Sequence, residues 1–251
     1  MIQIKNPTEL KGMMKAGELA AQALALAGKH AVPGISTWEL DKLVDNYVRS
    51  KGGHSPCKGY NGFPGHNCFS INEELIHGIP SKRKILKEGD ILSCDIVAEL
   101  NGFMGDNTGT FAVGEVSEEA KRIMKYTKEA LFKGIEQAVA GNRVGDISHA
   151  IEAHVRSGGY VPAEKFIGHG IGREMHEDPE VPNEGKAGHG PRLMPGMTIA
   201  IEPMINSHSQ KVRILNDKWT VVTTDGSLSC HFEHTVAITN GEPVILTLES
   251  H

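Results

Sequence analysis

The chain has 251 residues, with 31 acidic and 26 basic side chains and a formal net charge of −5 at neutral pH. This mild acidic excess gives no reason to expect nucleic-acid readout or binding to an anionic membrane. No apolar run approaches the ~18 residues of a membrane span, and the start of the chain, MIQIKNPTEL, lacks the apolar core of a signal peptide. The four cysteines (Cys57, Cys68, Cys94, Cys230) have no CxxC spacing, so we expect reduced thiols in a cytoplasmic protein.

Two helices are predicted at the start of the chain. Residues 6–9 (NPTE) have the pattern of a helix start, with a capping side chain, a proline in the first turn and a glutamate three positions later. Regularly spaced apolar residues continue this helix to about residue 29. Ser36 and Glu39 begin a second helix that runs to about residue 51. The Gly-, Pro- and aromatic-rich residues 52–65 then predict a loop before a short strand at 68–71.

Residues 89–114 predict two antiparallel strands joined at Asn101-Gly102, the commonest dipeptide of a tight hairpin turn. With this turn Val97 lies opposite Asp106, so Asp95 and Asp106 share one face as diagonal neighbours, about 7–8 Å apart at most. The surrounding strand residues are apolar, and burying an unpaired carboxylate costs free energy of folding. A bound metal ion usually compensates for this cost. On the hairpin alone, one acid in a turn and one at a wet edge is an equally good interpretation.

Two further helices are predicted over residues 117–140 and 146–157, followed by a glycine-rich segment at 166–183. The sequence GHGIG at 168–172 does not complete a nucleotide-binding GxGxxG loop, because the required last glycine is Arg173. The glycines around the histidine instead predict close approach of the backbone to a bound ion or substrate. His169 and His176 are expected on facing strands of a loop-linked pair.

The second half of the chain repeats the layout of the first. Four pairs of residues are each 107 positions apart: Gly34 and Gly141, Val48 and Val155, Gly89 and Gly196, and Asp95 and Glu202. Asp106 and Glu233 are each followed by threonine two positions later and by glycine eight positions later. We therefore expect an α+β fold in which residues 1–251 form one domain of two pseudo-symmetric halves, about 1–115 and 116–251, with four acids at the centre.

The candidate metal ligands are four carboxylates and one imidazole: Asp95, Asp106, His169, Glu202 and Glu233. This set is richer in oxygen than a structural zinc site and suits two divalent ions of the Mn, Fe or Co kind. Two such ions about 3.5–4 Å apart activate hydroxide and polarise a carbonyl group, which is hydrolytic chemistry. His77 and His176 remain as donors or acceptors beside the substrate. The residues alone indicate an amide hydrolase and leave the amide open.

These residues closely resemble the type I methionine aminopeptidases over nearly the whole chain, together with four motifs: HGIP at 77–80, GHGIG at 168–172, IEP at 201–203 and EHT at 233–235. The resemblance implies the pita-bread fold, an antiparallel sheet covered by helices, with two divalent ions (Co, Mn, Fe or Zn) at its centre. It implies hydrolytic removal of the initiator methionine from nascent proteins whose second residue is small. The expected partner is a nascent N-terminus at the ribosome, and the expected state is a monomer.

The resemblance also implies a role for each site residue. Asp106 and Glu233 would bridge the two ions, Asp95 would bind one of them, and His169 with Glu202 would bind the other. A bridging hydroxide would attack the scissile carbonyl, and Glu202 would move a proton from water to the leaving amine. His77 would contact the scissile amide nitrogen, and His176 would steady the carbonyl oxygen and its oxyanion.

The resemblance maps the methionine pocket onto apolar and soft residues that suit a thioether, namely Cys57, Tyr60, Phe63, Cys68 and Trp219. The family often has a tyrosine where this chain has Phe63 and an aromatic residue where it has Met175. It usually has a threonine where this chain has Asn107. The first two differences concern the rim of the pocket and the preference for the second residue of the substrate, and the third concerns a hydrogen bond beside a ligand.

Two other interpretations are less well supported. Another pita-bread peptidase, such as an X-Pro aminopeptidase or dipeptidase, would usually carry a large extra N-terminal domain and would leave the Cys57, Tyr60 and Cys68 pocket unexplained. A non-catalytic pita-bread binding protein would have lost metal ligands, whereas this chain has all five.

Overall fold

The computed structural model describes residues 1–249. Its main sheet is antiparallel and has the strand order β1-β3-β4-β13-β8-β6-β7, with β14 beside β13. The strands are β1 (Cys68–Ile71), β3 (Ile91–Leu100), β4 (Phe103–Ala112), β6 (Gly168–Gly170), β7 (Glu177–Val181), β8 (Thr198–Ile201), β13 (Glu233–Ala237) and β14 (Val244–Ile245). One sheet therefore runs through both halves of the chain.

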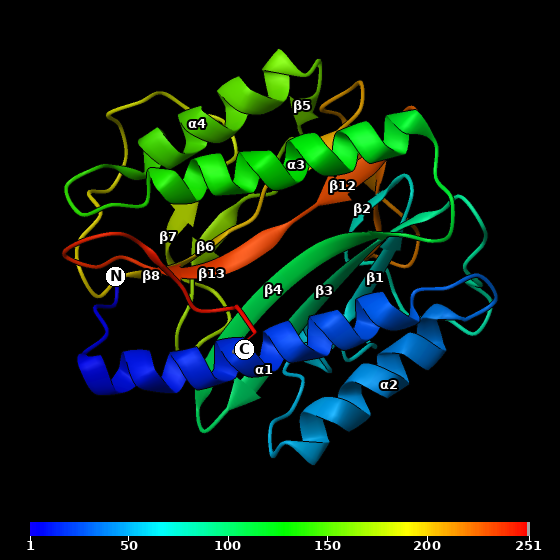
Figure 1. Ribbon diagram of the computed structural model, residues 1–251, viewed down its shortest axis with the longest axis horizontal. Coiled ribbons are helices and arrows are strands. Elements are labelled where there is room, and N and C mark those ends of the chain that lie inside the picture. The colour runs from blue at the N-terminus through cyan, green and yellow to red at the C-terminus, as the bar shows by residue number, and fades with distance from the viewer. Residues whose placement is uncertain (250–251) are drawn as a thin grey trace.

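Four helices pack on this sheet in two pairs (Figure 1): α1 (Pro7–His30) and α2 (Thr37–Ser50), then α3 (Glu118–Glu136) and α4 (Val144–Ser157). The first pair covers β3 and β4, where Leu19 and Leu24 of α1 share a buried cluster with Ile96. The second pair has its own cluster, in which Ile123 of α3 packs with Ile199 of β8. Each half thus buries its helices against its own strands.

The predicted helix starts are confirmed. Asn6 and Glu9 form a reciprocal capping box, in which each side chain accepts a hydrogen bond of 3.0 Å from the other residue's backbone N–H. Ser36 and Glu39 form a second one at the start of α2. Such caps satisfy backbone donors that the first helical turn leaves free. Among residues 1–249, no helix combines the length and apolarity needed to cross a membrane.

The predicted hairpin is also confirmed, and it fixes the position of two acids. Asn101 and Gly102 have φ angles of 55° and 79°, as a two-residue turn of type I′ requires. Val97 pairs with Asp106, so Asp95 and Asp106 are diagonal neighbours on one face. The two halves join where β13 pairs with β4, with Glu233 opposite Thr108. The central strands of the two halves thus carry Asp106 and Glu233 side by side.

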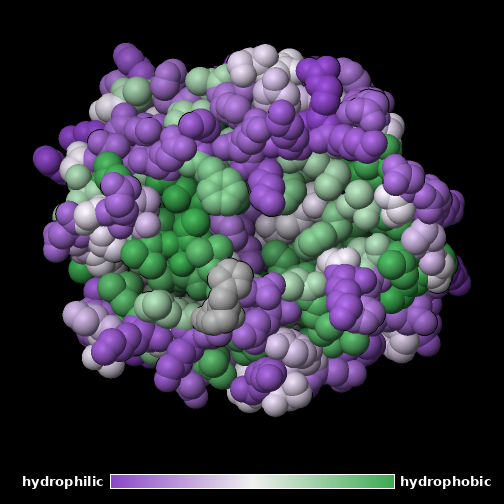
Figure 2. Space-filling model, in the orientation of Figure 1, coloured by the Kyte–Doolittle hydropathy of each residue, from purple (hydrophilic) through white to green (hydrophobic). Residues whose placement is uncertain are grey.

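Two small sheets flank the main one and shape the surroundings of the site. The first has the order β10-β11-β2 and the second β12-β9-β5. Their strands are β2 (Glu74–Ile76), β5 (Val161–Pro162), β9 (Met204–Asn206), β10 (Val212–Ile214), β11 (Val221–Thr223) and β12 (Ser229–His231), and a short 3-10 turn, η1, spans Tyr60–Gly62. On the helix-bearing face (Figure 2), hydrophilic side chains follow the helices and hydrophobic residues gather in the hollow between α1 and α3.

Candidate metal centre

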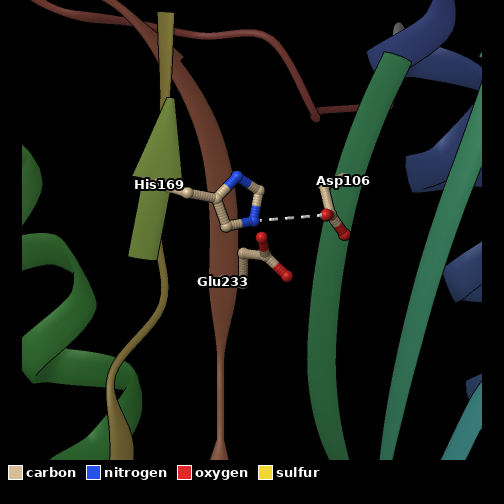
Figure 3. A group of neighbouring side chains, drawn as sticks. All are labelled: Asp106, His169 and Glu233. Atoms are coloured by element: carbon tan, nitrogen blue, oxygen red, sulfur yellow. Dashed lines mark ion pairs between the residues drawn. The ribbon is translucent and has the colours of Figure 1, made fainter. Parts of the chain in front are cut away.

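Three predicted ligands meet at the centre of the main sheet (Figure 3). Asp106 comes from β4, His169 from β6 and Glu233 from the first position of β13. One ligand atom from each residue lies within 4.8 Å of the other two. Nε2 of His169 lies 3.9 Å from Oδ2 of Asp106. A group of this size, with one nitrogen and two carboxylates, can hold a metal ion.

The other two predicted ligands flank this group. Glu202 directly follows β8, and its Oε1 lies 3.4 Å from Nε2 of His169. Asp95 lies on β3, diagonal to Asp106, and its negative charge contributes to raising the pKa values of Asp106, Glu202 and Glu233. All five residues predicted from the sequence therefore surround one place in the structure.

The carboxylates of this centre repel one another in a buried setting. Burial raises the pKa of Asp106 well above its usual range, and the charges of Glu233, Asp95 and Glu202 raise it further. Burial and the charge of Asp95 raise the pKa of Glu202 well above its usual range. Burial and the charges of Glu202 and Asp95 raise the pKa of Glu233 well above its usual range. Bound cations would relieve both the burial and the repulsion.

Two carboxylate oxygens have the environment of metal ligands. Oδ1 of Asp106 and Oε1 of Glu233 are buried and have no hydrogen-bond partner among residues 1–249. The other oxygen of Glu233 accepts a 2.7 Å hydrogen bond from the hydroxyl of Thr108, which holds the carboxylate in place. A buried carboxylate oxygen without a partner is costly, and a metal ion is a partner that these residues fit.

The two catalytic histidine candidates lie on either side of the centre. His77 has a φ of 57°, and its ring lies edge-on to Phe166 and Trp219, at centroid distances of 6.3 and 6.0 Å. A strained backbone of this kind persists where the surrounding structure enforces it, often at functional sites. Burial lowers the pKa of His77 to about 4. The ring centroid of His176 lies 4.3 Å from that of His169, and burial lowers the pKa of His176 as well.

The predicted methionine pocket is a cavity of about 390 Å³ that opens onto the carboxylates. All five predicted wall residues line it: Cys57, Tyr60, Phe63, Cys68 and Trp219. The buried side chain of Met175 packs against Cys57, Phe63 and Cys68. The Phe63 and Trp219 rings meet edge to face at 5.2 Å. Tyr60 differs from the other predicted residues because it is 40% exposed and lies 2.9 Å from Nδ1 of His176 through its hydroxyl oxygen.

The glycines around His169 allow close packing of neighbouring strands. A Cβ atom at Gly168 would collide with the carbonyl oxygen of Ala200, and one at Gly170 would collide with that of Asp178. These glycines let β6 pack tightly between β7 and β8. The predicted approach of this backbone to an ion or substrate stays a prediction.

His231 was not predicted from the sequence. Its side chain is 3% exposed, and its Nε2 lies 3.5 Å from Oε2 of Glu202. Burial lowers the pKa of His231 to about 4, although the charge of Asp95 opposes this shift. The signal available was its spacing, since His231 and Glu233 are two positions apart and extended chain places such residues on the same face.

Comparisons with known proteins agree with this geometry. The profile of metallopeptidase family M24 matches residues 11–240. A methionine aminopeptidase of Clostridium acetobutylicum is 52% identical over 248 residues, which cover 99% of each chain. The crystal structure of methionine aminopeptidase from Thermotoga maritima has a TM-score of 0.98 and 44% identity, covering 99% of this chain and 100% of that one.

A prolidase from Pyrococcus furiosus shares the fold, with a TM-score of 0.79 at 24% identity, and the match spans 66% of its chain. The much higher identity and full coverage of the methionine aminopeptidases favour them over the X-Pro peptidase alternative. The predicted pita-bread fold is confirmed. The chain belongs to metallopeptidase family M24 and, within it, to the methionine aminopeptidases.

Proposed function

We propose that this chain hydrolyses the bond after an N-terminal methionine in polypeptides whose second residue is small. The observation that carries this proposal is the cavity of about 390 Å³ in which an apolar slot and the carboxylate centre are continuous. Cys68 of β1 pairs directly with Asp95 of β3, so this slot residue lies beside a candidate ligand. A methionine side chain in the slot would therefore place its own carbonyl group beside the carboxylates.

We propose that the centre would hold two divalent ions, with Asp106 and Glu233 as shared ligands, Asp95 as a further ligand of one ion, and His169 and Glu202 as further ligands of the other. The set of donor groups supports this proposal, because four buried carboxylates with raised pKa values face one imidazole. When bound, ions of the Co, Mn, Fe or Zn kind would supply Lewis-acid polarisation of the carbonyl group and activation of water. In this proposal Glu202 carries a proton from water to the leaving amine.

The two histidines beside the cavity would bind the substrate through their ring nitrogens. We propose that the Tyr60 hydroxyl donates to Nδ1 of His176, which leaves the proton on Nε2 and makes that nitrogen a donor to the carbonyl oxygen. His77, held edge-on by Phe166 and Trp219, would contact the scissile amide nitrogen. Both rings are neutral at pH 7 because burial lowers their pKa values.

Replacing His77 or His176 by alanine should leave the metal content nearly intact, because neither residue is a proposed ligand. Alanine at His176 should lower kcat about 10²–10³-fold, the usual cost of losing one oxyanion donor. Metal analysis and steady-state kinetics on the same dialysed samples would check this. Loss of bound metal in either variant would show that the ligands have been misassigned.

Metal binding should also stabilise the fold. A divalent ion at about 100 times its dissociation constant adds about 2.7 kcal/mol to the free energy of unfolding, which raises Tm by roughly 5–10 °C for a chain of this size. Scanning calorimetry in Mn²⁺ and in a chelator would measure the difference. The Asp106→Ala variant is the control, because its Tm should respond little to Mn²⁺. An unchanged Tm in the parent protein would contradict the metal centre.

The function is tested by comparing two peptides. Met-Ala-Ser should be hydrolysed rapidly, whereas an Ala-Pro peptide should be cleaved slowly. The opposite preference would support an X-Pro peptidase, and cleavage of neither in the presence of Mn²⁺, Co²⁺, Fe²⁺ or Zn²⁺ would support a non-catalytic binding protein.

Pairing of β4 with β13 supports the proposal that both halves form one domain. Action on nascent chains at the ribosome, a monomeric state and a cytoplasmic location stay predictions.

A further inference from the structure

His231 has no part in the function proposed so far, yet its ring lies beside Glu202, one of the proposed ligands. It is the last residue of β12, and its Nε2 is buried with no hydrogen-bond partner among residues 1–249. Native proteins rarely leave a buried ring nitrogen without a partner, because such a group has lost its hydrogen bonds to water. The charged group that it approaches is the carboxylate of Glu202, at 3.5 Å.

The backbone of His231 is held on two sides, which fixes the position from which its side chain extends. Its N–H donates to the hydroxyl oxygen of Thr110 at 3.2 Å, and the same hydroxyl donates to its carbonyl oxygen at 2.7 Å. His231 also pairs with Met204 of β9, which places Glu202 diagonally across from it. Diagonal neighbours of this kind come within reach of long side chains.

Glu202 has a histidine on each side. Its Oε1 lies 3.4 Å from Nε2 of His169, and its Oε2 lies 3.5 Å from Nε2 of His231. Both separations are slightly longer than a hydrogen bond, as is common in active sites before the reacting complex forms. His169 uses its other ring nitrogen for a 2.9 Å contact with the carbonyl oxygen of Gly170. The two oxygens of Glu202 therefore have separate partners.

We propose that His231 is a positioning residue that donates its Nε2–H to Oε2 of Glu202 and so keeps Oε1 turned toward His169 and the bound ion. The inference rests on the proposed function, in which Glu202 is both a ligand and the carrier of a proton. A carboxylate that can rotate freely would present Oε1 to the ion for only part of the time. Partners that orient a ligand in this way typically change metal affinity or activity about 10–100-fold when they are removed.

Two variants separate the hydrogen bond from mere filling of space. Glutamine at position 231 keeps an N–H donor at similar reach, whereas leucine fills the site without one. His231→Leu should lower kcat about 10–100-fold and leave KM within about twofold of the parent value. In calorimetric titration, its affinity for the Mn²⁺ ion that Glu202 and His169 would hold should fall about tenfold. His231→Gln should restore both to within about threefold of the parent. His154→Leu is the matched control, since it removes another His–Glu contact, to Glu129 on α3.

Unchanged kcat in His231→Leu would overturn the proposal, and so would a His231→Gln variant as impaired as the leucine one. Nitrogen-15 NMR of histidine-labelled parent protein, without metal and with Zn²⁺, gives a second readout that needs no activity and no variant that must fold well. The resonance of His231 should show the proton on Nε2 in both samples. A proton on Nδ1 instead would overturn the contact. A parent with this tautomer that binds Mn²⁺ but leaves Met-Ala-Ser intact would refute the proposed function alone.

Discussion

Replacing Asp106 by alanine is expected to abolish the binding of both metal ions and to lower kcat/KM by more than the roughly 10–100-fold that changes around a metal ligand usually cost. Its Oδ1 has no partner, and its Oδ2 faces His169 at 3.9 Å, so each oxygen is free to hold one ion. The variant also leaves Asp95, Glu202 and Glu233 to repel one another in a buried centre, where the pKa of each is already raised.

His169→Ala is the matched comparison, because this residue can hold only one ion. Its Nδ1 lies 2.9 Å from the carbonyl oxygen of Gly170 and donates to it, which leaves Nε2 alone as a ligand atom. The variant should keep about one tightly bound ion and show little activity. Plasma-emission analysis of dialysed protein counts the ions in both variants. Two ions retained in Asp106→Ala would refute the bridging role, and none in His169→Ala would show that the two sites cannot be separated.

Much of this centre could be predicted from sequence because local rules fix it. The turn at Asn101-Gly102 sets the register of its hairpin, and that register alone makes Asp95 and Asp106 neighbours. Asp95 and Glu202 are 107 positions apart, and so are Gly89 and Gly196, which precede them. This repeat predicts a second pair of acids, Glu202 and Glu233, in the second half of the chain. In the structure β4 and β13 pair directly, which brings Asp106 of the first set close to Glu233 of the second.

What could not be predicted depends on contacts between distant segments. The contact of Tyr60 with His176 joins residues 116 positions apart, so no local sequence pattern predicts it. The glycines beside His169 look identical in sequence whether they make room for a ligand or for a neighbouring strand. The role of His231 could be predicted only by knowing that β12 pairs with β9, because this pairing brings its ring to Glu202. Such placements follow from tertiary packing, which overrides local signals.

A second large effect is expected in the choice of the N-terminal residue. The slot is lined by Cys57, Phe63, Cys68, Met175 and Trp219. These walls offer a thioether dispersion contacts and S–aromatic contacts, and each buried methylene adds about 0.8 kcal/mol of binding free energy. None of these walls is an anion that could pair with an ammonium group, whose burial costs several kcal/mol.

Peptides that differ only in the first residue test this slot. Relative to Met-Ala-Ser, Lys-Ala-Ser should lose about 10³-fold or more in kcat/KM, since about 4 kcal/mol corresponds to that factor. Leu-Ala-Ser should lose about 10–200-fold, because branching misplaces roughly one methylene. Norleucine-Ala-Ser is the control: it has the length of methionine without sulfur, so it should stay within about tenfold of the methionine peptide. If Lys-Ala-Ser and Met-Ala-Ser were cleaved equally well, the cavity beside the carboxylates would not be the methionine pocket.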